Sequence, residues 1–181
     1  MAPSPGGYPW YSLVSGDEVQ QGDIIENCPV FSPRITDLND PSIHSYFDWF
    51  EQDVVVLSQS CDLVKRPGKD KIDHVLLCSI YSRSEITNGI LATDKGMEDA
   101  RRGNLPSYHM LGECTLPEFY REIRLADFHA LWSLPLRYFR QRAERCGSRL
   151  RIMPPYREQL SQSFARFFMR VGLPLDIPPF H

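Results

Sequence analysis

A thiol, two hydroxyls, an amide and a carboxylate stand together in Ser58-Gln59-Ser60-Cys61-Asp62, directly after a run of valines. A cysteine acts as a nucleophile when a base, usually histidine, takes its proton. His109 lies in a predicted strand and His74 begins another, so both are candidate bases. This pattern predicts a cysteine-dependent hydrolase that uses Cys61 and Asp62 with His109 or His74. The alternative is a small buried cysteine whose neighbour Asp62 closes the turn.

Arginines form the second group of residues that could do chemistry. Between Arg121 and Arg170 the chain has eleven arginines, no lysine and only four acids, although its net charge is -3. A guanidinium group binds phosphate or carboxylate through two parallel hydrogen bonds. The segment therefore predicts a surface for RNA or for an acidic protein partner, with these candidate contacts: Arg137, Arg140, Arg149 and Arg151. The alternative is a solvated surface that balances the acidic remainder of the chain.

The spacing of the cysteines and histidines does not indicate a metal or a disulfide framework. The five cysteines are far apart and odd in number, and the five histidines do not cluster. Neither of the usual glycine-rich phosphate-binding patterns occurs, so we expect no cofactor. The first ten residues do not resemble a signal peptide, and no apolar run reaches the roughly 18 residues that span a membrane. We expect a cytoplasmic protein that does not enter a membrane.

Two strands are predicted beside the Cys61 cluster. Residues 53–58 contain three successive valines, which indicates burial on both faces of a sheet. Residues 74–81 are also rich in strand-forming residues, and the charged loop between the two segments predicts an antiparallel pair. Further strands are expected at 108–111 and 121–128, the latter half-buried with Ile123 and Leu125 on one side and Arg124 on the other.

Helices are expected at residues 84–101, 136–145 and from Pro155 to Gly172. The first contains Gly89 and Gly96, which predict a break. The last has one apolar face that must pack against a sheet or against a second copy of the chain, formed by Tyr156, Leu160, Phe164, Phe167 or Phe168, and Val171. We expect a flexible lead at 1–15, one domain at 16–175 and a tail at 176–181.

Four segments in this order resemble the PemK/MazF group, whose members are small SH3-like barrels and in many cases toxins that cut single-stranded RNA. "GDII" at 22–25 is similar to the first strand of that group, and "DVVVLSQ" at 53–59 to its central strand. "HVLLCSIYS" at 74–82 resembles the strand that leads to the active-site loop. "REIRLADFHAL" at 121–131, with the helix that begins at Pro155, resembles the closing strand and terminal helix.

The resemblance implies an α+β fold, mainly β: a small SH3-like antiparallel barrel with helical insertions and a C-terminal helix. It also implies a toxin or phage-defence protein that contacts RNA or a protein partner. Ser79 or Ser82 would correspond to the hydroxyl of the family, and Arg83 could replace its catalytic arginine. That arginine and the proline after it correspond here to residues 51–53, Glu-Gln-Asp, so the resemblance leaves cleavage open. A non-catalytic interaction module is the remaining alternative.

Overall fold

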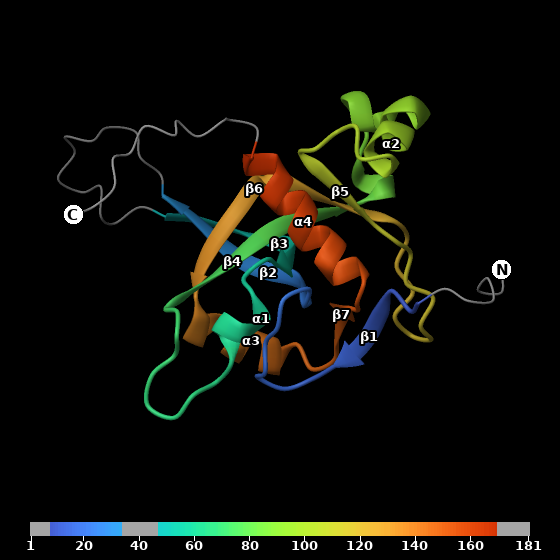
Figure 1. Ribbon diagram of the computed structural model, residues 1–181. Helices are drawn as coiled ribbons and strands as arrows, with labels where there is room; N and C mark the ends of the chain where they lie inside the picture. The colour runs from blue at the N-terminus through green and yellow to red at the C-terminus, as the bar shows by residue number, and fades with distance from the viewer. Residues whose placement is uncertain (1–7, 34–46, 170–181) are drawn as a thin grey trace, which may run out of the picture.

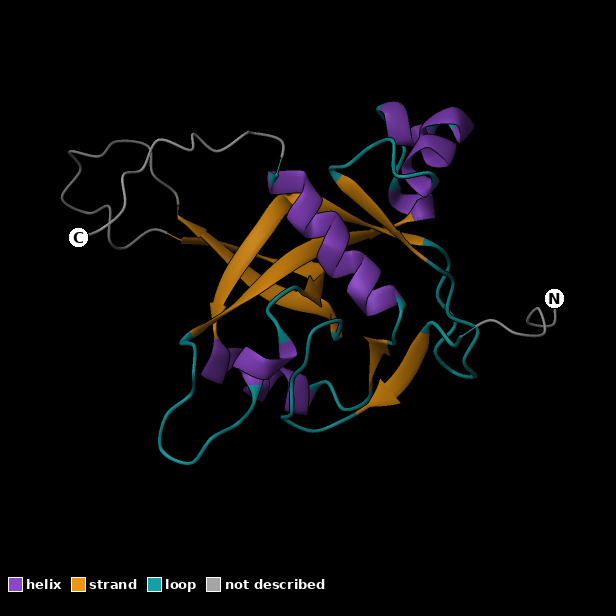
Figure 2. Cartoon of the chain, in the orientation of Figure 1, coloured by secondary structure: helices purple, strands orange, loops and turns teal. Residues whose placement is uncertain are grey.

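The computed structural model describes residues 8–33 and 47–169. This part of the chain is a mixed α+β structure with seven strands in two antiparallel sheets and four α-helices (Figures 1 and 2). The larger sheet has the strand order β2-β3-β4-β6-β5. The bounds of its strands are Ile24–Pro33 (β2), Phe47–Val56 (β3), His74–Ser82 (β4), Tyr108–Leu111 (β5) and Arg124–Pro135 (β6).

The expected antiparallel pair is present as β3 and β4, with Val55 opposite Cys78. The valines of β3 are fully buried because hydrophobic clusters cover both faces of the sheet. Val55 belongs to the cluster that includes α4 (Tyr156–Phe168), whereas Val54 and Val56 belong to the cluster that includes α3 (Leu136–Arg145). The prediction of burial on both faces is therefore confirmed.

The smaller sheet consists of β1 (Tyr11–Val14) and β7 (Arg149–Ile152). An isolated bridge between Asp23 and Arg151 connects it to the start of β2. The described strands do not close into a single barrel, so an SH3-like barrel is not confirmed. The expected flexible lead at 1–15 is wrong for its second half, since Tyr11 is buried and pairs with β7; residues 1–7 lie outside the described residues.

Two helices cover the two faces of the larger sheet. The helix expected at 136–145 is confirmed as α3, and its Phe139 is fully buried. The last helix, α4, lies across the opposite face of the sheet (Figure 1). There Leu160 is buried, and Phe164 packs edge-to-face on Phe128 of β6. The apolar stripe of α4 packs on the core through Tyr156, Leu160, Phe164 and Phe167, whereas Phe168 is 58% exposed and Val171 lies outside the described residues. The helix ends at Phe168, and the expected end at Gly172 lies outside the described residues.

The segment expected as one helix at 84–101 forms three short pieces. These are two 3-10 turns, Arg83–Glu85 and Ile90–Ala92, followed by α2, Asp94–Arg101. Gly89 precedes the second turn with a positive φ of 73°, which explains the break there. Gly96 instead lies inside α2, where a Cβ would stand only 1.9 Å from the Ile90 carbonyl oxygen. It permits close packing rather than a break.

For the strand at 121–128, the prediction of which side chains are buried is wrong. Arg124 and Leu125 are both 1% exposed, whereas Ile123 is 39% exposed. The strands β4 and β5 pair with both edges of β6 at Arg124 and Leu125. Leu125 is buried in a third hydrophobic cluster that includes residues of α2, and Arg124 makes an ion pair with Glu26 at 3.1 Å. The strand at 108–111 is confirmed as β5.

Candidate nucleic-acid-binding groove

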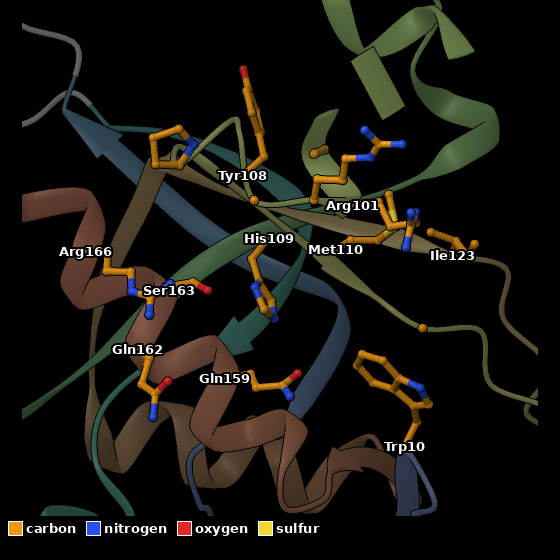
Figure 3. A pocket seen from close by; sticks show the side chains of 15 residues that line it. Trp10, Arg101, Tyr108, His109, Met110, Ile123, Gln159, Gln162, Ser163 and Arg166 are labelled. Atoms are coloured by element: carbon orange, nitrogen blue, oxygen red, sulfur yellow. The ribbon is translucent and has the colours of Figure 1, made fainter. Parts of the chain in front are cut away.

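A groove of about 400 Å³ lies between β5, the C-terminal end of α2 and α4 (Figure 3). Trp10, just before β1, closes one end. The groove is assembled from segments that are far apart in the sequence. Its lining residues are Trp10, Ala100, Arg101, Arg102, Gly103, Pro106, Tyr108, His109, Met110, Gly112, Ile123, Gln159, Gln162, Ser163 and Arg166.

The α4 wall presents two amides, a hydroxyl and a guanidinium group. Gln159, Gln162, Ser163 and Arg166 follow the i, i+3, i+4, i+7 spacing of one helix face. The helix is fixed in this rotation because Leu160 is buried on its other side. Arg166 is exposed and makes no ion pair with any residue in the described part of the chain. Its charge is available to a ligand.

Two further arginines come from the end of α2. Arg101 donates two hydrogen bonds to the Glu98 carboxylate at 2.6 and 2.7 Å, and Arg102 donates one at 2.6 Å. These contacts lower the pKa of Glu98 to about 2. Glu98 does not line the groove, and none of the described lining residues is Asp or Glu. The lining therefore offers three guanidinium groups and no carboxylate to repel an anion.

Trp10 forms a rigid end wall. Its ring stacks on Tyr156 with centroids 3.6 Å apart and planes 8° apart, and its carbonyl accepts a hydrogen bond from the Met153 amide at 2.8 Å. On the other side, Gly112 leaves space for the indole: a Cβ there would stand 2.4 Å from the ring. The indole is therefore packed closely against both Tyr156 and Gly112.

His109 points from β5 toward α4 inside the groove (Figure 3). Burial lowers the pKa of its imidazole to about 4. The ring is therefore neutral at pH 7, and its Nε2 atom is buried with no hydrogen-bond partner among the described residues. A neutral imidazole can offer a lone pair, an N–H group or a flat surface, but it adds no charge and is a weak general base at pH 7.

The structure does not bring together the predicted cysteine site. Cys61 is exposed on the short helix α1 (Ser60–Leu63), and its Sγ atom contacts the Asp62 carboxylate at 3.7 Å. That carboxylate also binds Lys71. Cys61 borders a hollow with no histidine among its described lining residues, while His109 lies in the groove and His74 is exposed at the start of β4. Within the described residues, no histidine is therefore placed to take the proton of the Cys61 thiol.

The serine and arginine expected to act on a phosphodiester are also apart. Ser79 is fully buried, and its hydroxyl accepts a hydrogen bond from Trp132 Nε1 at 2.8 Å. Ser82 caps the turn that begins at Arg83, and Arg83 faces Asp94 at 3.4 Å. These three side chains satisfy local structural needs instead of converging on one point.

Three of the four arginines expected to contact RNA have partners inside the protein. Arg140 binds Asp70 at 2.7 Å and also donates to the Leu63 carbonyl. Arg149 donates to Asp23 at 2.9 Å, and Arg151 binds the same buried carboxylate. Only Arg137 is exposed without a partner among the described residues. The arginine-rich segment thus contributes mainly to holding α3, β7 and β2 together.

The groove residues Trp10, Arg101 and Arg102 were not predicted as a site. Arg166 lies in the arginine-rich segment that was expected to contact RNA, but it was not one of the four arginines named as candidate contacts. The exposure of Arg166 could have been predicted, because it lies on the polar face of a helix whose apolar face is evident from the sequence. The approach of Trp10 and α2 to that face depends on long-range pairing, for which the sequence has no local signal.

Comparisons of the chain with protein-family models, curated proteins and solved structures found no match. Within the described residues, no helix has the length and apolar character needed to cross a membrane.

Proposed function

We propose that the protein binds single-stranded RNA in this groove, as a PemK/MazF-like protein of toxin or phage-defence type acting in the cytoplasm. The observation that carries the proposal is the lining itself: Arg101, Arg102 and Arg166 with no carboxylate. Guanidinium groups are suited to phosphate, and phosphate contacts supply most of the affinity for nucleic acids. The family and its cellular context rest on the sequence resemblance.

The other lining groups favour a nucleotide over a free phosphate ion. Gln159 and Gln162 can donate and accept hydrogen bonds at a base edge, and His109 adds a flat, uncharged ring. A volume of about 400 Å³ is in the range of sites for organic ligands rather than inorganic anions.

Single-stranded RNA fits better than a duplex. A groove narrow enough to be bordered on opposite sides by His109 and α4 admits unpaired bases, whose edges are open to side chains. Duplex RNA, in contrast, is recognised mainly through its phosphates and 2′-hydroxyls across a wide minor groove. Sequence preference would then come from the amides, since phosphate contacts are independent of sequence.

We propose binding without cleavage at this groove. A nuclease that works without a metal needs a general base, and the imidazole of His109, with its pKa lowered to about 4, is too weak a base at pH 7. Ser79, Ser82 and Arg83 lie outside the lining. Cleavage by the groove residues is therefore not part of the proposal.

Fluorescence anisotropy with labelled oligonucleotides tests the proposal. We expect an eight-nucleotide single-stranded RNA to bind more tightly than the corresponding duplex, with an affinity that falls as salt is raised. For single strands, each phosphate contact adds about 0.7 to the slope of log K against log salt, so three arginines predict a slope of about 2. Equal affinity for the duplex, or no dependence on salt, would argue against the groove as an RNA site. Single-stranded DNA of the same sequence measures the contribution of the 2′-hydroxyl groups.

A protein-interaction module is the second candidate function, and one observation favours it. Phe31 and Trp49 face each other across β2 and β3 and are 45% and 64% exposed, with Phe47 nearby at 62%. Exposed aromatic side chains gathered in one place are typical of protein interfaces. Light scattering over a range of concentrations, for the natural chain and for Trp49→Ser, shows whether this face joins two copies.

A further inference from the structure

A second hollow borders α4 on the side away from the groove. It has a volume of about 350 Å³ and is lined by Gln21, Gln59, Ser60, Cys61, Arg157, Glu158, Ser161 and Gln162. Gln162 also lines the groove. The two depressions therefore meet at one exposed side chain.

The rotation of α4 explains this arrangement. At 100° per residue, Gln159, Ser163 and Arg166 lie on one side of Gln162, and Glu158 and Ser161 lie on the other. Leu160 and Phe164 point the opposite way, into the core. Gln162 thus lies at the boundary between the groove and the hollow, and polar side chains of α4 flank it on both sides.

The hollow has fixed polar walls. Gln59 Nε2 donates to Ser161 Oγ at 3.1 Å, which ties the start of α1 to α4. The Ser60 hydroxyl accepts a hydrogen bond from the Gln21 amide at 3.1 Å, and the Gln21 side chain donates to the Leu57 carbonyl at 2.9 Å. The hollow is therefore lined by positioned amides and hydroxyls, and its shape does not depend on loose surface side chains.

The charges of the two depressions differ. In the hollow, Arg157 is paired with Glu158 at 2.8 Å, so the lining has one positive and one negative group. The described lining of the groove has three arginines and no acid, and Glu98, which pairs with Arg101 and Arg102, lies outside that lining. A phosphate is favoured in the groove, whereas the hollow suits an uncharged, hydrogen-bonding part of a ligand such as a ribose or a base.

We propose that one RNA strand crosses α4 over Gln162, with a phosphate held at Arg166 in the groove and a downstream or upstream nucleotide seated against Cys61 in the hollow. This inference rests on the proposed function and specifies its ligand: an oligonucleotide rather than a mononucleotide. Cys61 then contacts the bound RNA. The polar cluster at residues 58–62 thus has a role in binding that requires no general base.

The reactivity of Cys61 provides the test. Cys61 is exposed, whereas Cys28, Cys78 and Cys114 are buried and Cys146 is half-buried. In a Cys146→Ser background of the full chain, maleimide labelling therefore reports on Cys61. RNA of eight nucleotides at about ten times its Kd leaves roughly a tenth of the sites open, so we expect labelling about tenfold slower. Adenosine monophosphate at ten times its own Kd should leave the labelling rate unchanged.

Two outcomes overturn the inference in distinguishable ways. If the eight-nucleotide RNA binds in a manner that depends on Arg166 but does not slow labelling, the path is wrong and the proposed function stands. If the RNA does not bind at all, the proposed function and the path fail together. Equal protection by the mononucleotide would also contradict the path, because it would place a single nucleotide in the hollow.

A charge placed in the hollow gives an independent check. Ser161→Glu adds a carboxylate beside Gln59 but outside the groove lining. We expect the affinity for the eight-nucleotide RNA to fall about fivefold, since the new carboxylate repels the phosphates that flank the nucleotide in the hollow, while the affinity for adenosine monophosphate is unchanged. Ser133→Glu, at an exposed position of β6, is the matched control and should leave both affinities unchanged.

Discussion

Trp10 and Tyr156 stack with ring centroids 3.6 Å apart, although they are separated by most of the chain. This contact joins the segment before β1 to the first turn of α4 and so fixes the end wall of the groove. The wall depends on close packing on both sides of the indole ring, because Gly112 lies against the opposite side. A change on either side should therefore be visible both in stability and in ligand binding.

Gly112→Ala is predicted to displace Trp10. The new Cβ would lie 2.4 Å from the indole, so the ring or β5 must move. Overpacking of this kind costs about 1–3 kcal/mol of unfolding free energy. We expect lower stability in urea, altered tryptophan fluorescence and weaker RNA binding. Tyr156→Phe, which keeps the stacked ring, is the control; a Gly112→Ala protein with unchanged fluorescence and RNA affinity would show that this wall is not tightly packed.

Acid should destabilise the protein through His109. The folded protein holds the pKa of His109 at about 4 because the ring is buried, whereas an unfolded histidine titrates near 6.5. Between these values the unfolded state binds more protons, so the unfolding free energy falls as the pH drops from 6.5 to about 4. The loss is on the order of 2–3 kcal/mol.

His109→Gln should remove that part of the pH dependence, and urea titrations at pH 7 and pH 4.5 measure it. His74→Gln is the matched control, since His74 is exposed. If the difference between the two pH values is the same in His109→Gln as in the natural chain, the burial of this ring does not control acid stability.

Glu26→Ala should be among the most destabilising changes to a charged residue. Glu26 accepts hydrogen bonds from Arg121 at 2.6 and 2.7 Å and from Nη1 of the buried Arg124 at 3.1 Å. The Nε and Nη2 atoms of Arg124 have no hydrogen-bond partner among the described residues. Removing one partner of a fully buried pair costs about 3–5 kcal/mol. Because Glu26 is half-buried, we expect a cost at or below the lower end of that range.

Lys65→Ala removes an exposed ion pair with Asp17 and is the control, with an expected cost below about 1 kcal/mol. Similar unfolding free energies for Glu26→Ala and Lys65→Ala would mean that Arg124 finds another partner or reaches water.

The sequence was sufficient for most of the sheet and for α3. Three successive valines identified β3 because both faces of that strand are covered, and the charged loop after it identified its pairing with β4. The burial of the Arg124 side chain in β6 could not be predicted from the sequence. A buried arginine looks like a solvent-facing residue until the carboxylate that neutralises it, Glu26, is known to lie beside it.

The candidate site was harder to predict for the same reason. Arg149 and Arg151 were expected on a nucleic-acid surface, but both bind Asp23, which is more than 120 positions earlier. Cys61 and His109 looked like a possible pair because each follows or lies in a strand, yet they border different depressions. Residue type indicated which chemistry was possible, whereas the strand order and the rotation of α4 determined which groups meet.

The RNA affinity of Arg166→Glu compared with that of Arg137→Glu tests the central claim most directly. Both arginines are exposed, lie on helices and make no ion pair within the described residues, but only Arg166 lines the groove. We predict that Arg166→Glu weakens binding of an eight-nucleotide RNA about tenfold or more and lowers the salt slope by about 0.7, while Arg137→Glu changes neither. Equal losses in the two variants, or a loss only in Arg137→Glu, would contradict the assignment of RNA binding to this groove.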